Sequence, residues 1–328
     1  MKSVVIIGAG TAGLTAAGYL ARSGYRVTVM EKNAFPGGRC AAFITEGYRF
    51  DIGATLLMMP QVYERTFAEL GKPIADALEL QRLEIPYRLY FPDGQSLDFS
   101  SDLARMQSQL EKMEPGSFLP FLRYMDNSIY AYRMSMKHII DRNYDHIFQF
   151  INPSSMTRLL RVNAFGDHYR LASKYFRNEN LRTAFTFQNI YVGQDPFHAP
   201  AIFSMLPFME LTDGVFFPIG GMNRIAEVLE SIALENGTEI LYRTAITGIS
   251  VSGSRVKGVV TASGDFFPAD IVLANADLPY VYQELLPRGR AHRRISRLGY
   301  TCSALVMHWG MDTVIPGLEQ HNIFVSDH

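Results

Sequence analysis

The chain has 328 residues, of which 48% are hydrophobic and 19% are charged, so it can bury a large core and is not intrinsically disordered. Its 31 basic and 32 acidic residues give a formal net charge of −1, without the basic excess typical of a nucleic-acid-binding protein. No apolar run reaches the length of a membrane-spanning helix, no cleavage site follows the opening apolar run, and two cysteines cannot build a disulfide framework. We therefore expect no spanning helix, no exported precursor, no metal site and a reducing cytosol.

The opening of the chain predicts a βαβ unit. Residues 2–7 are a short β-branched apolar run that ends at glycines, which is typical of a buried strand. Residues 14–23 carry small and apolar side chains at helical spacing, and residues 25–30 alternate as a second strand. This arrangement indicates a nucleotide-binding opening.

The glycines between the first strand and the helix form a GxGxxG dinucleotide-binding fingerprint. Gly8 permits a tight turn, Gly10 lets the backbone approach a pyrophosphate, and Gly13 lets the helix pack closely on the strand. The phosphates would lie at the helix N-terminus, where free N–H groups and the helix dipole favour negative charge. Glu31, at the end of the second strand, can accept hydrogen bonds from an adenosine ribose.

The sequence Pro36-Gly37-Gly38-Arg39 follows Glu31 and favours a flavin over a nicotinamide cofactor. The two glycines keep the backbone close to a cofactor, and Arg39 can reach a phosphate or the edge of an isoalloxazine ring. The alternative interpretation is an exposed turn with a solvated arginine.

A second domain is predicted to interrupt the first. Helical patterns predominate from Pro60 to about Thr212, with apolar residues three or four apart in residues 118–136 and a strand-like patch at residues 87–91. Later residues return the chain to the first domain with predicted strands at 214–219, 239–242, 245–251, 255–261 and 271–274, and a helix at 223–235. Residues 302–325 carry further strand signals. The fold class is thus α/β, with residues 1–70 plus 214–290 as the nucleotide-binding domain and residues 71–213 plus 291–328 as an inserted, mixed α+β domain.

These motifs together resemble a known family. GAGTAG at residues 8–13, Glu31, PGGR at 36–39 and YRFDIG at 48–53 are similar to motifs of the flavin amine-oxidase superfamily. Later stretches resemble the bacterial phytoene desaturases, which are carotenoid desaturases; these are residues 50–63, 184–197, 214–222, 272–287 and 321–327. The resemblance covers essentially the whole chain. It also implies a C-terminal glycine-rich segment that completes the flavin site, and since nothing after Asp277 resembles it, the chain looks C-terminally truncated.

The resemblance implies a Rossmann-like, GR2-type FAD-binding domain with an inserted substrate domain. It implies an FAD-dependent oxidoreductase of carotenoid biosynthesis that desaturates a long apolar polyene, phytoene or diapophytoene, by hydride transfer to flavin N5. Its partners would be the polyene, a quinone or oxygen as electron acceptor, and the cytoplasmic membrane, to which a cytoplasmic protein would attach peripherally. The alternatives are a carotene cis–trans isomerase, a polyene saturase, a non-catalytic prenyl-binding relative like the Rab GDP-dissociation inhibitors, or an inactive fragment.

The resemblance also implies roles for individual residues. Glu31 would hold the ribose, Arg39 a phosphate and Ile246 the adenine through its backbone, and residues 274–277 would lie beside the cofactor. Asp277 can instead cap the following helix. The full set of predicted cofactor-binding residues is Gly8, Gly10, Thr11, Ala12, Gly13, Glu31, Lys32, Gly37, Gly38, Arg39, Ile246, Ala274 and Asn275.

The aromatic content of 12% and the 15 methionines are consistent with either a roomy core or a channel for a long apolar molecule. The predicted channel residues are Leu56, Leu57, Met58, Phe185, Phe187, Phe203, Met205, Phe208, Phe216 and Phe217. No catalytic residue is predicted. His198, in a loop that resembles the family, is a candidate base or a structural histidine. The basic cluster at residues 288–297 is a candidate contact for anionic lipids or a solvated helix face.

Overall fold

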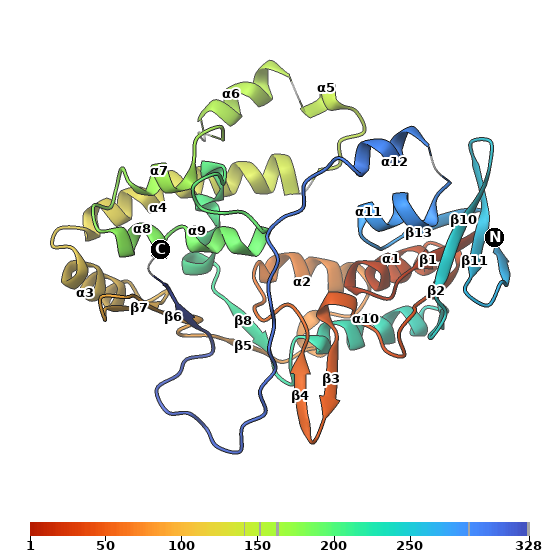
Figure 1. The fold of residues 1–328 in the computed structure, drawn as a ribbon, viewed down its shortest axis with the longest axis horizontal. Coiled ribbons are helices and arrows are strands. Elements are labelled where there is room, and N and C mark those ends of the chain that lie inside the picture. The colour runs from red at the N-terminus through yellow and green to blue at the C-terminus, as the bar shows by residue number, and fades with distance from the viewer. Residues whose placement is uncertain (141, 151, 162–163, 288, 327–328) are drawn as a thin grey trace. The chain divides into compact units, whose positions relative to one another are not determined.

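The computed structural model describes residues 1–140, 142–150, 152–161, 164–287 and 289–326, apart from the side chains of residues 150, 290 and 291. The chain divides into two compact units (Figure 1). Unit 1 consists of Met1–Gln81 and Phe216–Tyr300, and unit 2 consists of Arg82–Val215 and Thr301–His328. The unit boundaries therefore fall at 81/82, 215/216 and 300/301, where the sequence indicated 70/71, 213/214 and 290/291.

Unit 1 contains the predicted βαβ opening and the strands that return after the insertion. Its first part forms β1 (Ser3–Ile7), α1 (Thr11–Arg22), β2 (Arg26–Met30), β3 (Ala42–Thr45), β4 (Tyr48–Asp51), α2 (Pro60–Glu69) and β5 (Leu80–Arg82), whose last residue begins unit 2. Its second part forms β8 (Phe216–Pro218), α10 (Asn223–Glu235), β9 (Glu239–Leu241), β10 (Ile246–Ser252), β11 (Arg255–Thr261), β12 (Phe266–Pro268), β13 (Ile271–Ala274), α11 (Leu278–Tyr280) and α12 (Arg290–Ile295).

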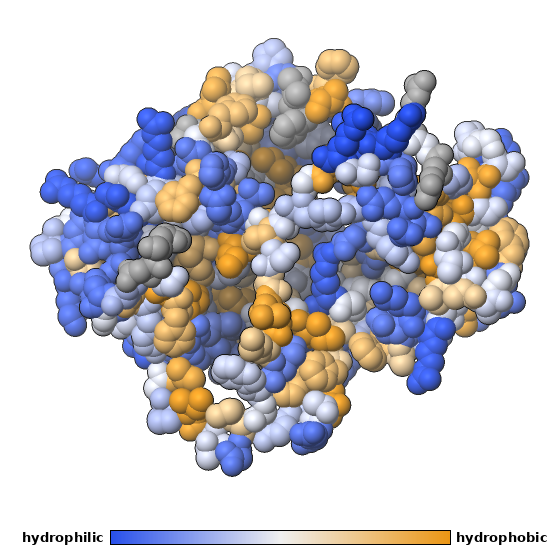
Figure 2. All heavy atoms as spheres, in the orientation of Figure 1, coloured by the Kyte–Doolittle hydropathy of each residue, from blue (hydrophilic) through white to orange (hydrophobic). Residues whose placement is uncertain are grey.

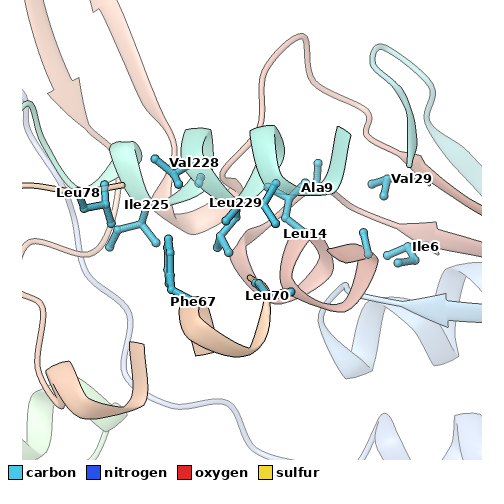
Figure 3. Close-up of a cluster of buried hydrophobic side chains, with 14 of the residues drawn as sticks. Ile6, Ala9, Leu14, Val29, Phe67, Leu70, Leu78, Ile225, Val228 and Leu229 are labelled. Carbon is cyan, nitrogen blue, oxygen red and sulfur yellow. The ribbon is translucent and has the colours of Figure 1, made fainter. Parts of the chain in front are cut away.

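The central sheet of unit 1 is parallel and has the order β13-β1-β2-β9. Residues 4–7 of β1 are all apolar because both faces of this strand are covered. Val4 and Ile6 belong to the cluster that includes residues of α1, α2 and α10 (Figure 3), whereas Val5 and Ile7 pack with residues of the antiparallel sheet β10-β11-β12. This three-layer arrangement places the loop after β1 at the carboxyl edge of the sheet, where ligands bind in open α/β sheets.

Unit 2 is mostly helical and has a small sheet. Its elements are β6 (Tyr87–Tyr90), β7 (Ser96–Phe99), α3 (Leu103–Met113), α4 (Phe118–Ser135), α5 (Ile147–Phe150), α6 (Pro153–Arg161), α7 (His168–Ala172), α8 (Glu179–Ala184), α9 (Met205–Thr212) and β14 (Asn322–Phe324). Its core is rich in aromatic rings, and the rings of Phe176 and Phe185 stack with centroids 4.8 Å apart.

The predicted helix over residues 118–136 is present as α4, but its buried face differs from the spacing used to predict it. Phe121, Tyr124 and Ala131 are buried, whereas Leu122 is exposed. The helix has apolar residues on more than one side, so periodicity finds the helix without finding the face that packs.

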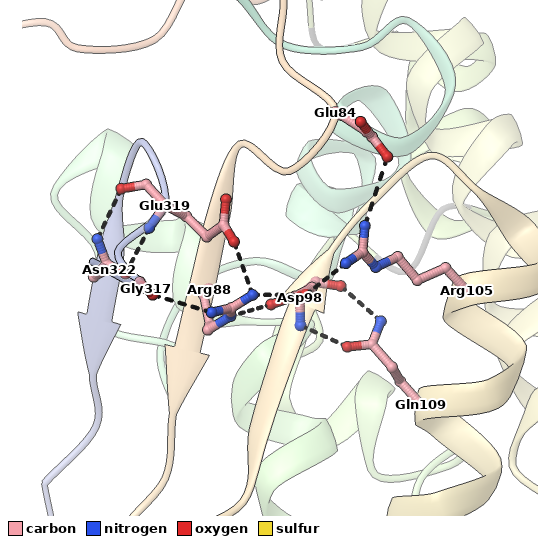
Figure 4. A network of polar contacts seen from close by, with 8 residues as sticks. All are labelled: Glu84, Arg88, Asp98, Arg105, Gln109, Gly317, Glu319 and Asn322. Atoms are coloured by element: carbon pink, nitrogen blue, oxygen red, sulfur yellow. Dashed lines mark hydrogen bonds and ion pairs between the residues drawn. The ribbon is translucent and has the colours of Figure 1, made fainter.

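A polar network joins the strands of the small sheet in unit 2 (Figure 4). The Arg88 guanidinium on β6 pairs with Asp98 on β7 and lies 2.8 Å from the Glu319 carboxylate, just before β14. Arg105 donates to Asp98 Oδ2 at 3.2 Å, and the same oxygen accepts from Arg88 at 3.0 Å. These charges hold β14 parallel to β6 in the order β14-β6-β7.

The strand signals of residues 302–325 are realised in one strand, β14. Only Asn322–Phe324 forms a strand there, and the preceding residues from Thr301 on contain turns and irregular backbone. Strand-forming side chains yield a strand only where a neighbouring strand supplies hydrogen-bonding partners. In the described part of this stretch, β6 supplies them for β14 alone.

Candidate functional site

The loop after β1 requires glycine for steric reasons. Gly8 has a φ of 99°, and its N–H donates to the Met30 carbonyl at 2.8 Å. A Cβ atom on Gly13 would lie 2.2 Å from the Gly8 carbonyl oxygen and 2.6 Å from Asn275 Nδ2. The first turn of α1 therefore packs so closely against the loop that any residue with a Cβ atom would clash at Gly13.

The N-terminus of α1 has the properties of an anion-binding site. Gly10 is the N-cap residue with an extended backbone, and no side chain caps this end of the helix within the described residues. Thr11, Ala12 and Gly13 form the first turn, which carries no acidic residue. Because the first N–H groups of a helix have no intrahelical acceptor, they can donate to phosphate oxygens, and the helix dipole favours the negative charge. The residues present thus fit a pyrophosphate.

Glu31 is buried at the end of β2 and holds the fingerprint loop in place. Its Oε2 accepts from the Ala9 N–H at 2.8 Å, and its Oε1 accepts from the Asn33 N–H at 2.9 Å. A carboxylate has about four acceptor positions, so each oxygen retains capacity for a further hydrogen bond. Lys32, the next residue, is exposed. Glu31 can therefore position the loop and accept from the hydroxyl groups of a ribose at the same time.

The Gly37-Gly38 turn packs against the same loop. The Gly37 N–H donates to the Ala9 carbonyl at 2.9 Å, and the two glycines have φ values of 116° and 56°. A Cβ atom on Gly37 would lie 2.8 Å from the Ala41 Cα. The turn predicted to keep the backbone close to a cofactor thus lies beside the N-terminus of α1.

Arg39 forms an ion pair with Asp277, and both side chains are largely exposed, at 84% and 65%. Asp277 is the N-cap residue of α11, but its side chain makes no capping hydrogen bond. The alternative in which Asp277 caps this helix is therefore wrong, because its carboxylate is directed to the guanidinium instead. The predicted contact of Arg39 with a phosphate stays a prediction.

The remaining predicted cofactor residues come from late in the chain. The Asn275 N–H donates to the Ile7 carbonyl at 2.9 Å, and its Nδ2 donates to the Gly8 carbonyl at 3.2 Å. Ala274 pairs with Ile7 in β13, and Ile246 is buried among the residues between the two sheets of unit 1. The fold thus brings Ala274 and Asn275 directly against the fingerprint loop.

A groove of about 400 Å³ runs beside α1 and was not foreseen from the sequence. Thr11 and Thr15 on α1, Tyr63 and Phe67 on α2, and Ile225 and Leu229 on α10 are among the residues that line it. It begins at the predicted anion site and is mostly apolar, with hydroxyl groups at intervals. Three helices from distant parts of the sequence form it, so no local motif marks it.

The predicted channel residues are divided between the two units. Leu57, Phe216 and Phe217 belong to the core of unit 1, and Phe185 and Phe187 belong to the aromatic core of unit 2. Of the other five, Met205 packs beside α4 and Phe208 is buried in α9. The remaining three are half-buried: Leu56, Met58 and Phe203. Core packing accounts for the fully buried members.

Glu210 is a buried carboxyl group in unit 2 that no sequence motif marks. Its Oε2 accepts from the Tyr87 hydroxyl at 2.6 Å, and its Oε1 has no partner among the described residues. Gln188 donates to the same Tyr87 hydroxyl at 3.0 Å. Burial raises the pKa of Glu210 to about 7. The sequence signal was a single acidic residue within the apolar stretch 205–211.

The other candidates occupy exposed positions. His198 Nδ1 lies 3.0 Å from both carboxylate oxygens of Asp195 in its own turn. The basic cluster contains α12, while its first residue, Arg288, lies outside the described residues. Among described residues, no group of three or more histidine, cysteine or acidic side chains could hold a metal ion. In the part of the chain that the structure describes, no helix has the length and apolarity needed to cross a bilayer.

The sequence of the chain matches the model of the family described as flavin containing amine oxidoreductase over residues 11–316. The chain therefore belongs to this family, and the fold class and the superfamily expected from its motifs are confirmed. A solved structure of a putrescine oxidase variant superposes with a TM-score of 0.62 at 17% identity, over 90% of this chain and 63% of that one. That likeness confirms the α/β fold.

Curated relatives are more similar in sequence. A zeta-carotene-forming phytoene desaturase of Myxococcus xanthus is 39% identical over 98% of this chain and 62% of its own length. A phytoene desaturase of Phycomyces blakesleeanus is 38% identical over 99% of this chain and 57% of its own length. The chain thus spans about three fifths of the length of these relatives.

Proposed function

We propose that this chain binds FAD and acts in the desaturation of a long apolar polyene, phytoene or diapophytoene. The observation that carries the proposal is the uncapped N-terminus of α1 beside the Glu31 carboxylate, in a chain similar to phytoene desaturases over nearly its whole length. Residues 1–70 and 214–290 would hold the cofactor, and residues 71–213 and 291–328 would contact the substrate.

A bound flavin would supply the acceptor for a hydride in such a reaction. The chain's own residues would bind and orient this cofactor. The first N–H groups of α1 would hold the pyrophosphate, Glu31 would accept from the ribose, and Arg39 would leave Asp277 to bind a phosphate. The predicted channel residues that are only partly buried would supply the apolar, water-free surroundings that a hydrocarbon requires; these are Leu56, Met58, Phe187, Phe203, Met205, Phe216 and Phe217. A quinone or oxygen would accept the electrons, and the enzyme would lie peripherally on the cytoplasmic membrane, where its substrate dissolves.

The first experiment is the visible absorption spectrum of the 328-residue chain after incubation with excess FAD and desalting. We expect a retained flavin band in the wild type and a strongly reduced band in Glu31→Gln. Glu46→Gln, at an exposed turn of the same unit, is the matched control and should retain the flavin. A wild-type chain that retains no flavin would contradict cofactor binding by this chain.

The second experiment supplies phytoene in liposomes to the flavin-loaded chain with a quinone, followed by chromatography of the products. Desaturation predicts products with additional conjugated double bonds. Products that differ from the substrate in double-bond geometry alone would identify an isomerase, and products with fewer double bonds would identify a saturase.

A further inference from the structure

Unit 2 exposes a group of large apolar side chains around two short helices. In α5, Ile147 and Phe148 have exposed fractions of 61% and 81%, and Leu160 of α6 and Phe165 just after it have 63% and 68%. We call these four residues the α5–α6 surface. Figure 2 shows two groups of orange spheres at the top of the view, one over α5 and one over α6 as drawn in Figure 1. Single exposed apolar residues are ordinary, but a group of this kind marks an interaction surface.

The α5–α6 surface is anchored to the rest of unit 2 by its opposite side. Leu159 and Ala164 pack against Ala131 and Met134 of α4. The Arg161 guanidinium carbon lies 4.5 Å from the centroid of the Tyr130 ring, which is a cation–π contact. The neighbouring Leu160 is exposed to solvent. One side of α6 is therefore fixed to the unit while the other presents apolar atoms.

The same stretch of sequence carries exposed positive charge. Lys137, Arg142 and Arg161 are exposed. The pKa of His138 is lowered, first by burial and then by Arg158, Arg142 and Lys137, so these cations from different segments lie near one imidazole. Residues 137–165 contain four basic and two acidic residues, in a chain whose net charge is −1. Exposed apolar side chains among basic ones are typical of segments that lie in the interface of an anionic bilayer.

We propose that the α5–α6 surface is where the protein attaches to a membrane that contains anionic lipids. Ile147, Phe148, Leu160 and Phe165 enter the boundary between headgroups and acyl chains, and Lys137 and Arg142 contact the lipid phosphates. A second copy of the chain is a poorer occupant, because symmetric self-association would bring the basic residues of both copies together. The inference rests on the proposed function, in which the substrate is dissolved in a bilayer.

The test is flotation of the full chain with vesicles of phosphatidylglycerol and phosphatidylcholine, and with phosphatidylcholine vesicles alone. We expect binding to the anionic vesicles, and a loss of about tenfold in the partition coefficient for Phe148→Ser. The matched control is Phe266→Ser, at an exposed phenylalanine of β12 in unit 1, which should leave the partition coefficient unchanged. Circular dichroism of each variant verifies that it is folded.

A second pair of variants tests the charges. Lys137→Gln with Arg142→Gln should lower anionic-vesicle binding about tenfold. The matched pair Lys174→Gln with Arg123→Gln, also exposed in unit 2, should not. Arg161 is left in place because its contact with Tyr130 also supports packing.

Three results would overturn the proposal: no binding of the wild type to anionic vesicles, equal binding by Phe148→Ser and Phe266→Ser, or a loss confined to Arg294→Gln with Arg297→Gln near α12. A change in oligomeric state in Phe148→Ser, measured by sedimentation without vesicles, would assign the surface to a second copy instead. The vesicles contain no polyene and the protein receives no FAD. A failed desaturation assay would therefore not contradict membrane attachment. A failed vesicle-binding test would not contradict desaturation, which can be measured in detergent micelles.

Discussion

Glu31 in unit 1 and Glu210 in unit 2 are both buried carboxyl groups, but their surroundings are opposite. Both oxygens of Glu31 accept from backbone N–H groups, of Ala9 and Asn33. Glu210 has a phenol, Tyr87, on one oxygen and no partner among the described residues on the other. Backbone N–H groups stabilise a carboxylate, whereas the burial of Glu210 outweighs its polar contacts with Tyr87, Tyr191 and Gln188 and favours the neutral acid.

The difference shows how each unit is organised. The predicted site of unit 1 is built mainly from backbone groups, in the glycine turns and at the N-terminus of α1. The Glu31 carboxylate accepts hydrogen bonds from some of these backbone N–H groups. The interior of unit 2 is defined by contacts between side chains, through stacked rings and a neutral acid. The following predictions separate these two kinds of organisation.

The largest effect is expected at the closest backbone approach in unit 1. Gly13→Val would place Cβ on the Gly8 carbonyl oxygen, at 2.2 Å, so β1 and α1 must separate. We expect the free energy of unfolding to fall by more than about 3 kcal/mol, with loss of flavin retention. Urea denaturation measures the change. Gly248→Ala, where a Cβ meets no atom within 4 Å, is the control and should stay within about 0.5 kcal/mol of wild type.

Glu210 should make unit 2 less stable as the pH rises. Its pKa is raised by burial from 4.5 to about 7 in the folded protein, so the unfolded chain releases this proton at lower pH. The stabilising contribution is complete below pH 4.5 and is lost as the pH rises through 7, by about 3 kcal/mol. Unfolding free energies of wild type and Glu210→Gln between pH 5 and 9 measure this loss. Parallel pH profiles for the two proteins would contradict it.

His168 should act in the opposite direction over a neighbouring pH range. Burial lowers the pKa of this histidine from 6.5 to about 4 in the folded protein, where its ring contacts Tyr124 and Asn189. Its contribution to stability is complete above pH 6.5 and is lost as the pH falls through 4, by an amount on the order of 3 kcal/mol. Between pH 4.5 and 6.5 the two groups therefore offset one another. In Glu210→Gln, stability should rise with pH over this interval, and a flat profile would exclude the histidine effect.

The substitution Glu31→Gln should lower the free energy of unfolding by less than the changes above. The pH profiles of Glu210 and His168 should not be affected by it. A glutamine has one amide oxygen and one NH₂ group, so it can accept from the N–H of Ala9 or of Asn33 but not from both. The other buried N–H then faces the NH₂ group and has no acceptor. We expect the free energy of unfolding to fall by about 2 kcal/mol at pH 7. If Glu31→Gln were as stable as wild type while Glu210→Gln were strongly destabilised at pH 8, the comparison between the two glutamates would be reversed.

The smallest effect is expected for the exposed pair of Arg39 and Asp277. Asp277→Asn removes an ion pair whose side chains are 65% and 84% exposed, so stability should change by about 0.5 kcal/mol or less. Flavin retention should not fall, because the freed guanidinium can still reach a phosphate. Arg39→Ala should show the same small change in thermal unfolding, but it should lower flavin retention.

The predictable part of the site is the part in which backbone geometry dictates the residue type. Gly8 and Gly13 are visible in the sequence because a Cβ atom cannot fit there, and Glu31 is visible because it follows a strand at a fixed spacing. Asn275 came only from the family resemblance, since its contact with Gly8 joins residues 267 positions apart. Glu210 and the groove beside α1 were missed because their neighbours come from distant segments.

The same limit applies to the fold. Periodicity predicted α4, but it did not identify the face containing Phe121 and Tyr124, because packing partners decide which apolar face is buried. Strand propensity in residues 302–321 was not realised in the structure, since a strand also needs an adjacent strand.

The parallel sheet of unit 1 has a consequence for synthesis on the ribosome. β1 lies between β2 and β13, and the Ser3 N–H donates to the Asp270 carboxylate across 267 positions of sequence. The edge of β1 that pairs with β13 therefore has no partner until the chain has been translated past Ala274. Residues 82–215 of unit 2 emerge earlier as one continuous stretch and can begin to collapse first. Chaperones that shield unpaired strand edges would accordingly have their longest contact with the first residues of the nascent chain.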